Sequence, residues 1–455
     1  MNNKNIIFSI FIFILVSITI FMIKFFQIEN ANTQTIEATV LSNIDAKLIV
    51  QDKDNIIYTF NFNDKTIQNG SNIAIEYTGL IDKNKSIQEA NIVNYKTVEA
   101  KPDENGIPLE WLDNGIFSDY YIQANNKLKE LTLDEKIGQL FLVRYPETSA
   151  INDLQKYNFA GYIFFEKDFK DKTEQEVKTM INNLQKSAKI PILTAVDEEG
   201  GKVLRVSSNP KLASENFKSS SELYNLGGFN KIKEDTINKS KLLNNLGLNL
   251  NLAPVVDVST DPNAYMYERT LKQNTTLTST FAKTVIEASK GTGVSYTLKH
   301  FPGYGNNADT HIGVTVDTRT FEELVENDLP PFSAGIKAGA EAILVSHNTV
   351  TAIDPNSQAS ISADVHNLLR DDMKFTGIIM TDDISMDAVS NITDVVPNSI
   401  LAGNDLIITT DYIGSINAVK DALNDRTISE SQINKLAFRV LSWKYYKGLM
   451  TENQK

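Results

Sequence analysis

The chain has 455 residues, of which 42% are apolar, so it can bury a large core as two or three domains or as one large barrel with additions. A formal net charge of -13 and an isoelectric point near 5.0 argue against a nucleic-acid partner, because phosphate binding needs clustered lysine and arginine. The absence of cysteine excludes disulfides, thiolate metal sites, thiol nucleophiles and a lipidated N-terminal cysteine.

The N-terminal segment is strongly apolar. No charged residue lies between Lys4 and Lys24, and the run is close to the ~20 residues that a membrane-spanning helix needs. The nearest candidate cleavage site, at Ala31, has a charged residue where a small one is required. We therefore expect residues 1–26 to be a transmembrane anchor, in contact with the membrane through residues 5–26, rather than a cleaved signal segment. The expected location is the cell membrane, with the remainder of the chain outside the cytoplasm, or secretion if the segment is cleaved.

Residues 33–98 are predicted to form a small all-β domain. Apolar side chains at Tyr58 and Phe60 alternate with polar ones, and the same alternation runs through residues 73–78, as in half-buried strands. This stretch contains no group of residues that suggests catalysis, so we interpret it as a spacer or an interaction module. Residues 99–118 are predicted to be the linker to the rest of the chain.

Residues 119–450 alternate short apolar runs with helical stretches. Capping-box patterns from Thr173 to Glu176 and from Thr320 to Glu323 mark the starts of two helices. Eight apolar runs suit buried parallel strands: residues 139–143, 161–165, 192–196, 248–256, 294–298, 342–345, 377–380 and 405–408. Eight such alternations predict an α/β fold of the TIM type, a (β/α)8 barrel, with a doubly wound open sheet as the competing architecture.

Polar residues stand at the ends of most of these runs. They are Asp197, Asp257, Lys299 with His300, Ser346 with His347, Thr381 with Asp382, and Asp411. In a barrel these positions converge on the single rim where such enzymes hold their chemistry. One polar residue at a strand end is more often a turn or a helix cap, but six sets together favour an active site.

One glycine-rich turn and the residues just after it carry two of the four histidines. The turn runs from Lys299 to Gly305 and is followed by Asp309 and His311. Glycines within and after it allow sharp bends, so the segment can carry its polar groups to a ligand. The pattern predicts a mobile loop for acid-base chemistry.

With these motifs the chain resembles the β-N-acetylglucosaminidases of glycoside hydrolase family 3. The matching stretches are residues 197–205, 252–258, 268–270, 299–305 with 309–311, and 381–386. They occur in the order of the family, and the resemblance covers about residues 125–450. Two positions depart from the family pattern, since Tyr304 stands where a second histidine is common and Glu198 where glutamine is usual. These departures bear on affinity or pH optimum more than on the reaction class.

The resemblance implies a retaining glycoside hydrolase that works through a covalent glycosyl-enzyme. Asp382 would be the nucleophile and His311 the general acid and base, with Asp309 holding the imidazole in the required tautomer. The same resemblance implies that the sugar hydroxyls and the acetamido group are contacted by Asp197, Arg205, Arg269, Lys299 and His300.

The expected substrate is a terminal β-linked N-acetylglucosamine, cleaved in the exo mode from cell-wall muropeptides or related glycans. No cofactor and no metal ion is expected. Because a histidine acid presents no anionic charge to an incoming anion, phosphate in place of water stays open as the acceptor.

Structural roles stay open for individual residues. Arg205 is also explained as a surface charge or an ion-pair partner, and Lys299 as a partner of Asp197 that never touches substrate. We expect His347 to be a structural polar residue at a strand end and His366 to be an ordinary surface residue.

Two other classes of function are compatible with the residues. His300, His311, His347, Asp309 and Asp382 offer ligands for a metal-dependent barrel hydrolase, although the first strand lacks a His-x-His pair to begin such a site. The third class is an anchored, catalytically silent saccharide-binding protein.

Overall fold

The computed structural model describes residues 33–44, 46–54, 56–62, 67, 71–82, 87–88, 90–97, 102–305, 307, 313–390 and 392–451. The chain divides into two compact units, Met1–Ala100 and Lys101–Lys455. The predicted anchor at residues 1–26 lies outside the described residues. Within the described ranges, no helix combines the length and the apolar character needed to cross a membrane.

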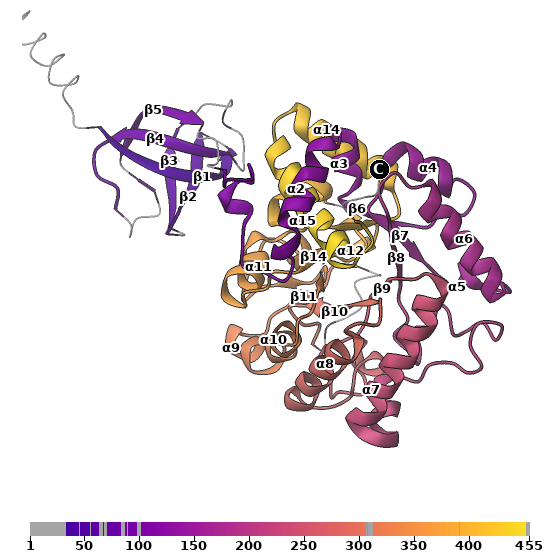
Figure 1. Ribbon diagram of the computed structural model, residues 1–455. Coiled ribbons are helices and arrows are strands. Elements are labelled where there is room, and N and C mark those ends of the chain that lie inside the picture. The colour runs from indigo at the N-terminus through magenta and orange to yellow at the C-terminus, as the bar shows by residue number, and fades with distance from the viewer. Residues whose placement is uncertain are drawn as a thin grey trace, which may run out of the picture. The chain divides into compact units, whose positions relative to one another are not determined.

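The first unit contains a five-stranded antiparallel sheet with the strand order β3-β2-β1-β4-β5 (Figure 1). Its strands are β1 (Gln34–Ile44), β2 (Lys47–Asp52), β3 (Ile57–Asn61), β4 (Asn72–Thr78) and β5 (Asn91–Thr97). The predicted alternation is observed in β3, where Tyr58 and Phe60 are buried in a core with Val50 and Ile75. The prediction of a small all-β fold is therefore confirmed for this part of the chain.

The second unit is built on eight parallel strands in one sheet, with the order β14-β12-β10-β9-β8-β7-β6-β15. The strands are β6 (Phe141–Arg144), β7 (Gly161–Phe164), β8 (Leu193–Val196), β9 (Leu250–Asn251), β10 (Ser295–Phe301), β12 (Ala342–Val345), β14 (Ile378–Thr381) and β15 (Ile407–Thr409). A parallel bridge between Met380 and Leu406 joins the two end strands, so the sheet nearly closes into a barrel. The barrel prediction is confirmed and the open doubly wound sheet is wrong, because strand order follows the chain without a reversal.

Helices surround the strands on the outside of the barrel (Figure 1). They are α2 (Tyr121–Glu130), α3 (Leu133–Gly138), α4 (Ala150–Tyr157), α5 (Glu166–Phe169), α6 (Glu174–Ser187), α7 (Ser220–Leu246), α8 (Thr275–Ser289), α9 (Phe321–Asn327), α10 (Leu329–Lys337), α11 (Ala363–Asn367), α12 (Asp387–Ser390), α13 (Val395–Ala402), α14 (Tyr412–Asn424) and α15 (Glu430–Tyr446). Short turns of 3-10 or π helix are η1 (Leu109–Trp111), η2 (Ser118–Tyr120), η3 (Tyr267–Arg269), η4 (Ala359–Ile361) and η5 (Leu368–Asp372), and β11 (Val316–Asp317) pairs with β13 (Thr349–Val350).

Local sequence signals explain where several helices begin. The capping boxes predicted at Thr173 and Thr320 are both observed, with each threonine side chain accepting a hydrogen bond from the backbone N–H three residues later. The same device starts α15 at Ser429. These caps satisfy N–H groups at helix starts that would otherwise lack partners, which fixes the first turn of each helix.

The expectation that His366 lies on the surface is wrong. Its side chain is buried, and Nδ1 donates a hydrogen bond to the carbonyl of Ser362, the residue that caps the start of the same short helix. Burial lowers the pKa of His366, so the neutral imidazole is favoured. The residue lies in α11, which packs against α13, and this long-range contact covers a side chain that looks exposed in the sequence.

Candidate active site

The polar residues at the strand ends meet within the mouth of the barrel. Lys299, at the end of β10, places Nζ 2.7 Å from Asp197 Oδ1, which follows β8. Because β9 lies between these two strands, their side chains meet on one face of the sheet, and helices cover the outer face (Figure 1). Lys299 is 3% exposed, so this pair lies on the floor of the site rather than at its edge.

Glu199 is the centre of this floor, although it was not singled out from the sequence. Its Oε1 lies 2.7 Å from Lys299 Nζ, and its two oxygens accept from Arg269 Nη2 at 2.6 Å and Arg269 Nε at 3.0 Å. Burial on its own would raise the pKa of Glu199, but Lys299 and Arg269 hold it well below the usual value. One carboxylate therefore fixes two of the cations expected to contact the sugar.

Glu198 stabilises a backbone turn, whereas Glu199 binds two cationic side chains. The Oε2 atom of Glu198 accepts hydrogen bonds from the backbone N–H groups of Arg205 (2.8 Å) and Val206 (2.6 Å), and its Oε1 accepts from Ser207 Oγ. The carboxylate thus orders the turn that carries Arg205, whose Nη2 lies 4.0 Å from Asp197 Oδ2. Glu198 stands where the family usually has glutamine, and its additional negative charge is stabilised by hydrogen bonds from backbone N–H groups.

Asp257 orients His300. The Nδ1 atom of His300 lies 2.7 Å from Asp257 Oδ2, and the same carboxylate accepts from the backbone N–H groups of His300 (3.2 Å) and Tyr304 (2.7 Å). Since an ionised carboxylate only accepts, Nδ1 carries the proton and Nε2 is the nitrogen that can face a ligand. Asp257 was predicted at the rim, but its role as a support for the turn was not.

Asp382 directly follows β14, and its backbone N–H donates to the carbonyl of Val345. Burial alone would raise the pKa of Asp382, but the electrostatic influence of His347, His300 and Lys299, together with the N–H of Asp383, holds it below the usual value. The carboxylate is therefore ionised at neutral pH, as a nucleophile must be.

His347 supports the strand end that carries Asp382. It is fully buried, with Nε2 located 3.0 Å from the carbonyl oxygen of Asp383 and Nδ1 located 2.7 Å from Ser360 Oγ. The structure thus places it in the wall of the site. In the part of the chain that the structure describes, no group of three or more His, Asp and Glu side chains is arranged to hold a metal ion.

The predicted acid-base pair, Asp309 and His311, lies outside the described residues. A cluster around Arg319 holds the described flanks of this segment. Arg319 donates from Nη1 to Asp328 Oδ2 (2.6 Å), from Nη2 to Asp317 Oδ2 (2.6 Å), and from Nη2 to the carbonyl of Gly303 (3.3 Å). Burial raises the pKa of Asp328 to about 7 despite the lowering effect of Arg319.

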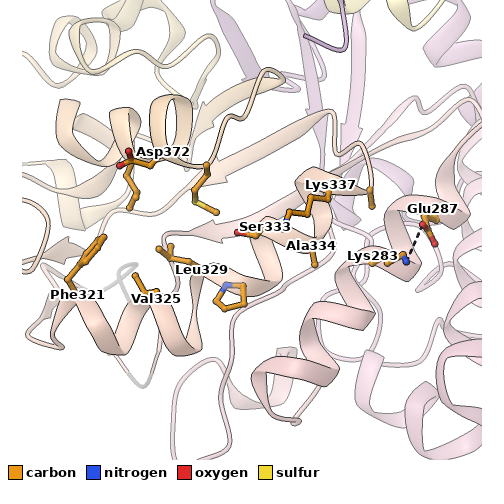
Figure 2. Close-up of a pocket in the computed structure, with 13 residues that line it drawn as sticks. Lys283, Glu287, Phe321, Val325, Leu329, Ser333, Ala334, Lys337 and Asp372 are labelled. Atoms are coloured by element: carbon orange, nitrogen blue, oxygen red, sulfur yellow. Dashed lines mark ion pairs between the residues drawn. The ribbon is translucent and has the colours of Figure 1, made fainter. Parts of the chain in front are cut away.

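A large cavity lies away from these residues. Its volume is about 810 Å³, and Figure 2 shows its lining residues on α8, α9, α10 and η5 at the outside of the barrel. Apolar side chains line much of it, including Phe321, Val325, Leu329, Leu368 and Met373. No predicted site residue borders it, so cavity size does not locate the chemistry in this protein.

Comparison with known proteins decides the family. The model of the glycosyl hydrolase family 3 N-terminal domain matches residues 132–443, which is most of the second unit. The chain belongs to glycosyl hydrolase family 3. This match spans every described residue of the mouth of the barrel.

Similar proteins give the enzyme type. A β-hexosaminidase of Xanthomonas euvesicatoria pv. vesicatoria (strain 85-10) is 31% identical over 245 residues, which are 52% of this chain and 70% of that protein. A β-hexosaminidase of Xylella fastidiosa (strain M23) is 31% identical over 253 residues, 53% of this chain and 72% of that protein. These similarities support a glycoside hydrolase of the β-N-acetylhexosaminidase type, as the motifs predict.

Solved structures agree with this assignment. A family 3 β-N-acetylglucosaminidase from Paenibacillus sp. str. FPU-7 has a TM-score of 0.66 and 25% sequence identity, covering 71% of this chain and 64% of that chain. The match therefore spans less than two thirds of the Paenibacillus chain. A β-N-acetylhexosaminidase from Beutenbergia cavernae DSM 12333, at 23% identity and a TM-score of 0.62, covers 69% of this chain and 99% of that chain and supports the fold.

A substitution at Gly303 measures how closely the glycine-rich turn of this family 3 enzyme packs against Asp328. Its φ is +126°, and a Cβ atom there would lie 2.4 Å from the side chain of Asp328. We expect Gly303→Ala to lower the free energy of unfolding by about 3 kcal/mol, from overpacking and an unfavourable φ together. Gly291 has a φ of +72° and open space around it, so Gly291→Ala is a matched control with a cost of about 1 kcal/mol. Equal losses of the free energy of unfolding in the two variants, measured by urea denaturation, would contradict the close contact between a Cβ atom at position 303 and Asp328.

Proposed function

We propose that the protein is a retaining, exo-acting β-N-acetylglucosaminidase that removes terminal β-linked N-acetylglucosamine from cell-wall muropeptides or related glycans. The observation that carries this proposal is the ionised, half-buried carboxylate of Asp382 in the same mouth as Lys299 and Arg269, the two cations paired with Glu199. Similarity to family 3 β-hexosaminidases supports the sugar specificity.

In the proposed first step, Asp382 attacks the anomeric carbon. The bond from this carbon to the leaving oxygen breaks as the bond to the carboxylate forms, and His311 gives its proton to the leaving oxygen. In the second step, His311 takes a proton from water, and the resulting hydroxide displaces Asp382 from the anomeric carbon. Asp309 holds the imidazole throughout.

Recognition of the sugar falls to the remaining predicted residues. Lys299 and Arg269 present several N–H donors, and their fixation on Glu199 means that little side-chain freedom is lost when a sugar binds. Asp197 accepts hydrogen bonds from hydroxyl groups, while His300 offers Nε2. We assign hydroxyl and acetamido contacts to these four residues.

The proposed place of action is outside the cytoplasm at the cell membrane. The uncharged apolar run between Lys4 and Lys24 supports this proposal, because its length fits a membrane anchor at residues 1–26. Cell-wall fragments are accessible from that side. Fractionation of cells tests the location, and activity confined to the cytoplasmic fraction would contradict it.

Release of nitrophenol from an aryl β-N-acetylglucosaminide tests the activity. We expect that a chelator does not change the rate of hydrolysis. Analysis of the products formed from muropeptides and from chitobiose shows which natural substrate is preferred. Binding of the sugar without any nitrophenol release would favour a silent binding protein, and loss of activity with the chelator would favour a metal-dependent hydrolase. If a glycosyl phosphate forms when inorganic phosphate is added, phosphate replaces water as the acceptor of the sugar.

The proposed role of His311 as general acid can be tested separately. We expect His311→Ala to slow substrates with poor leaving groups by about 10³-fold, and activated aryl glycosides far less, because only poor leaving groups need protonation. The measurement is kcat/KM across aryl glycosides of graded leaving-group pKa. An equal loss on all of them would indicate that the histidine is structural.

A further inference from the structure

Two arginines at the mouth of the barrel share one aromatic ring. Arg144 is the last residue of β6, Phe165 directly follows β7, and Arg205 lies on the turn after β8. The guanidinium carbons of Arg144 and Arg205 lie 4.5 Å and 5.2 Å from the centroid of the Phe165 ring. Stacking of this kind fixes the plane of a guanidinium group and therefore the direction of its N–H donors.

The sheet register places Arg144 inside the barrel. Arg144 is paired with Ile163, and Ile163 is paired with Ala195. Side chains of residues in register share a face, and Ala195 shares its face with Asp197 two residues later. Asp197 reaches Lys299 across the interior, so Arg144 points into the same mouth.

These two arginines differ from the other cations of the site in their charge balance. Lys299 and Arg269 are both paired with carboxylates at 2.6–2.7 Å. Arg205 approaches Asp197 only at 4.0 Å, and Arg144 forms no ion pair with a carboxylate of the described residues. Among the described residues, these two guanidinium groups therefore have no carboxylate partner closer than 4.0 Å, in a chain with a net charge of -13.

The nearby buried acid, Asp168, is engaged with the backbone. Its Oδ2 accepts a hydrogen bond from the backbone N–H of Phe165 at 2.8 Å, which fixes the start of α5 behind the ring. Burial raises the pKa of Asp168, while the N–H of Phe165 and the charge of Arg144 act in the opposite direction. Asp168 forms no ion pair within 4.0 Å of Arg144, so the N–H donors of Arg144 stay available to a ligand.

We propose that Arg144 and Arg205, aligned on Phe165, form a subsite for an acidic substituent of the saccharide, either a carboxylate or a phosphate. The proposal rests on the proposed function and deepens it by naming a group that the enzyme recognises. Arginine suits this role because its planar fork binds two oxygens of such a group at once. The acidic group has two possible sources, namely the lactyl carboxylate of a muramic acid leaving sugar or a phosphate on the terminal sugar.

Matched substrate pairs distinguish the two sources. The first pair is N-acetylglucosaminyl-β-1,4-N-acetylmuramic acid and its methyl ester, and the second is nitrophenyl N-acetylglucosaminide with and without a 6-phosphate. We expect kcat/KM to be about tenfold higher for the acidic member of one pair, since hydrogen bonds to charged groups are the stronger ones. The ratio between the two members is expected to fall as salt is added.

Arg144→Gln should bring the acid-to-neutral ratio close to one, and Arg144→Lys should retain part of it. Arg426→Gln is the matched control, because it removes one positive charge from an exposed loop between α14 and α15. It should keep the wild-type ratio. Equilibrium binding of the acid and its ester to an Asp382→Asn variant provides the same comparison without turnover.

Two results overturn the subsite. One is a wild-type ratio near one for both substrate pairs, and the other is the same change of ratio in Arg144→Gln and Arg426→Gln. Either result leaves the proposed function intact as long as the neutral aryl glycoside is hydrolysed. If the wild-type protein hydrolyses no N-acetylglucosaminide at all, the proposed function fails first and the subsite fails with it.

Discussion

Asp382→Asn is expected to lower kcat by at least about 10³-fold on an aryl β-N-acetylglucosaminide, while the sugar still binds. The substitution removes the anion that attacks the anomeric carbon and keeps the shape of the side chain. The backbone N–H of Asp383, which donates to Oδ1 at 2.9 Å, can donate equally to an amide oxygen. Initial-rate kinetics and equilibrium binding of N-acetylglucosamine measure the two effects separately.

Asp383→Asn is the control for this substitution. Asp383 is the next residue along the chain, and its carboxylate accepts hydrogen bonds from Ser385 N–H and Thr410 Oγ1. The control variant should keep kcat within a few-fold of the wild type. If Asp382→Asn also kept kcat within that range, Asp382 would not be the nucleophile.

Glu199→Gln is expected to have the second largest effect. The neutral amide cannot balance the buried Lys299 and the half-buried Arg269, which lie at 2.6–2.7 Å from the wild-type carboxylate. Removing one partner of a buried ion pair costs about 3 kcal/mol or more of the free energy of unfolding. Misplacement of the two cations should also lower kcat/KM by about 10²-fold. Urea denaturation and steady-state kinetics measure these losses.

The pH dependence of this stability loss has a definite sign. The pKa of Glu199 is lower in the folded chain than in the unfolded one, because Lys299 and Arg269 outweigh the effect of burial. Its contribution to stability is therefore fully present above the ordinary glutamate pKa of about 4.3 and declines as the pH falls below it. The difference between wild type and Glu199→Gln should be largest near pH 7 and shrink in acid.

Glu198→Gln is a matched control at the adjacent residue. Its Oε2 accepts from two backbone N–H groups, a task that an amide oxygen can take over. The amide nitrogen then faces Ser207 Oγ, which can accept as well as donate. We expect a much smaller loss than for Glu199→Gln. Equal losses in the two variants would mean that any change in this segment disrupts the site.

The barrel was predictable because its signals are local. Capping boxes at Thr173 and Thr320 and apolar runs of strand length mark elements within a few residues, and each strand was located to within a few positions. The fourth run was predicted over residues 248–256, but β9 spans only two residues. The rim residues followed from the rule that strand ends of a barrel converge.

The supporting contacts of the site could not be predicted in the same way. Glu199 meets Arg269 across 70 positions of the chain, and Arg144 and Arg205 both meet Phe165 only because three strands lie side by side. Their partners are set by tertiary structure, and no local pattern in the sequence identifies them. The burial of His366 was missed for the same reason. The roles of Asp309 and His311 stay predictions.

The most direct test of the account is the identity of the residue that carries the sugar during turnover. A slow fluorinated N-acetylglucosaminide substrate should trap the glycosyl-enzyme, and peptide mass spectrometry then locates the added mass. We predict that the sugar is attached to the peptide containing Asp382, with no label on the Asp382→Asn variant. Attachment to another carboxylate of the mouth, such as Asp257, or turnover without any covalent adduct would contradict the proposed mechanism.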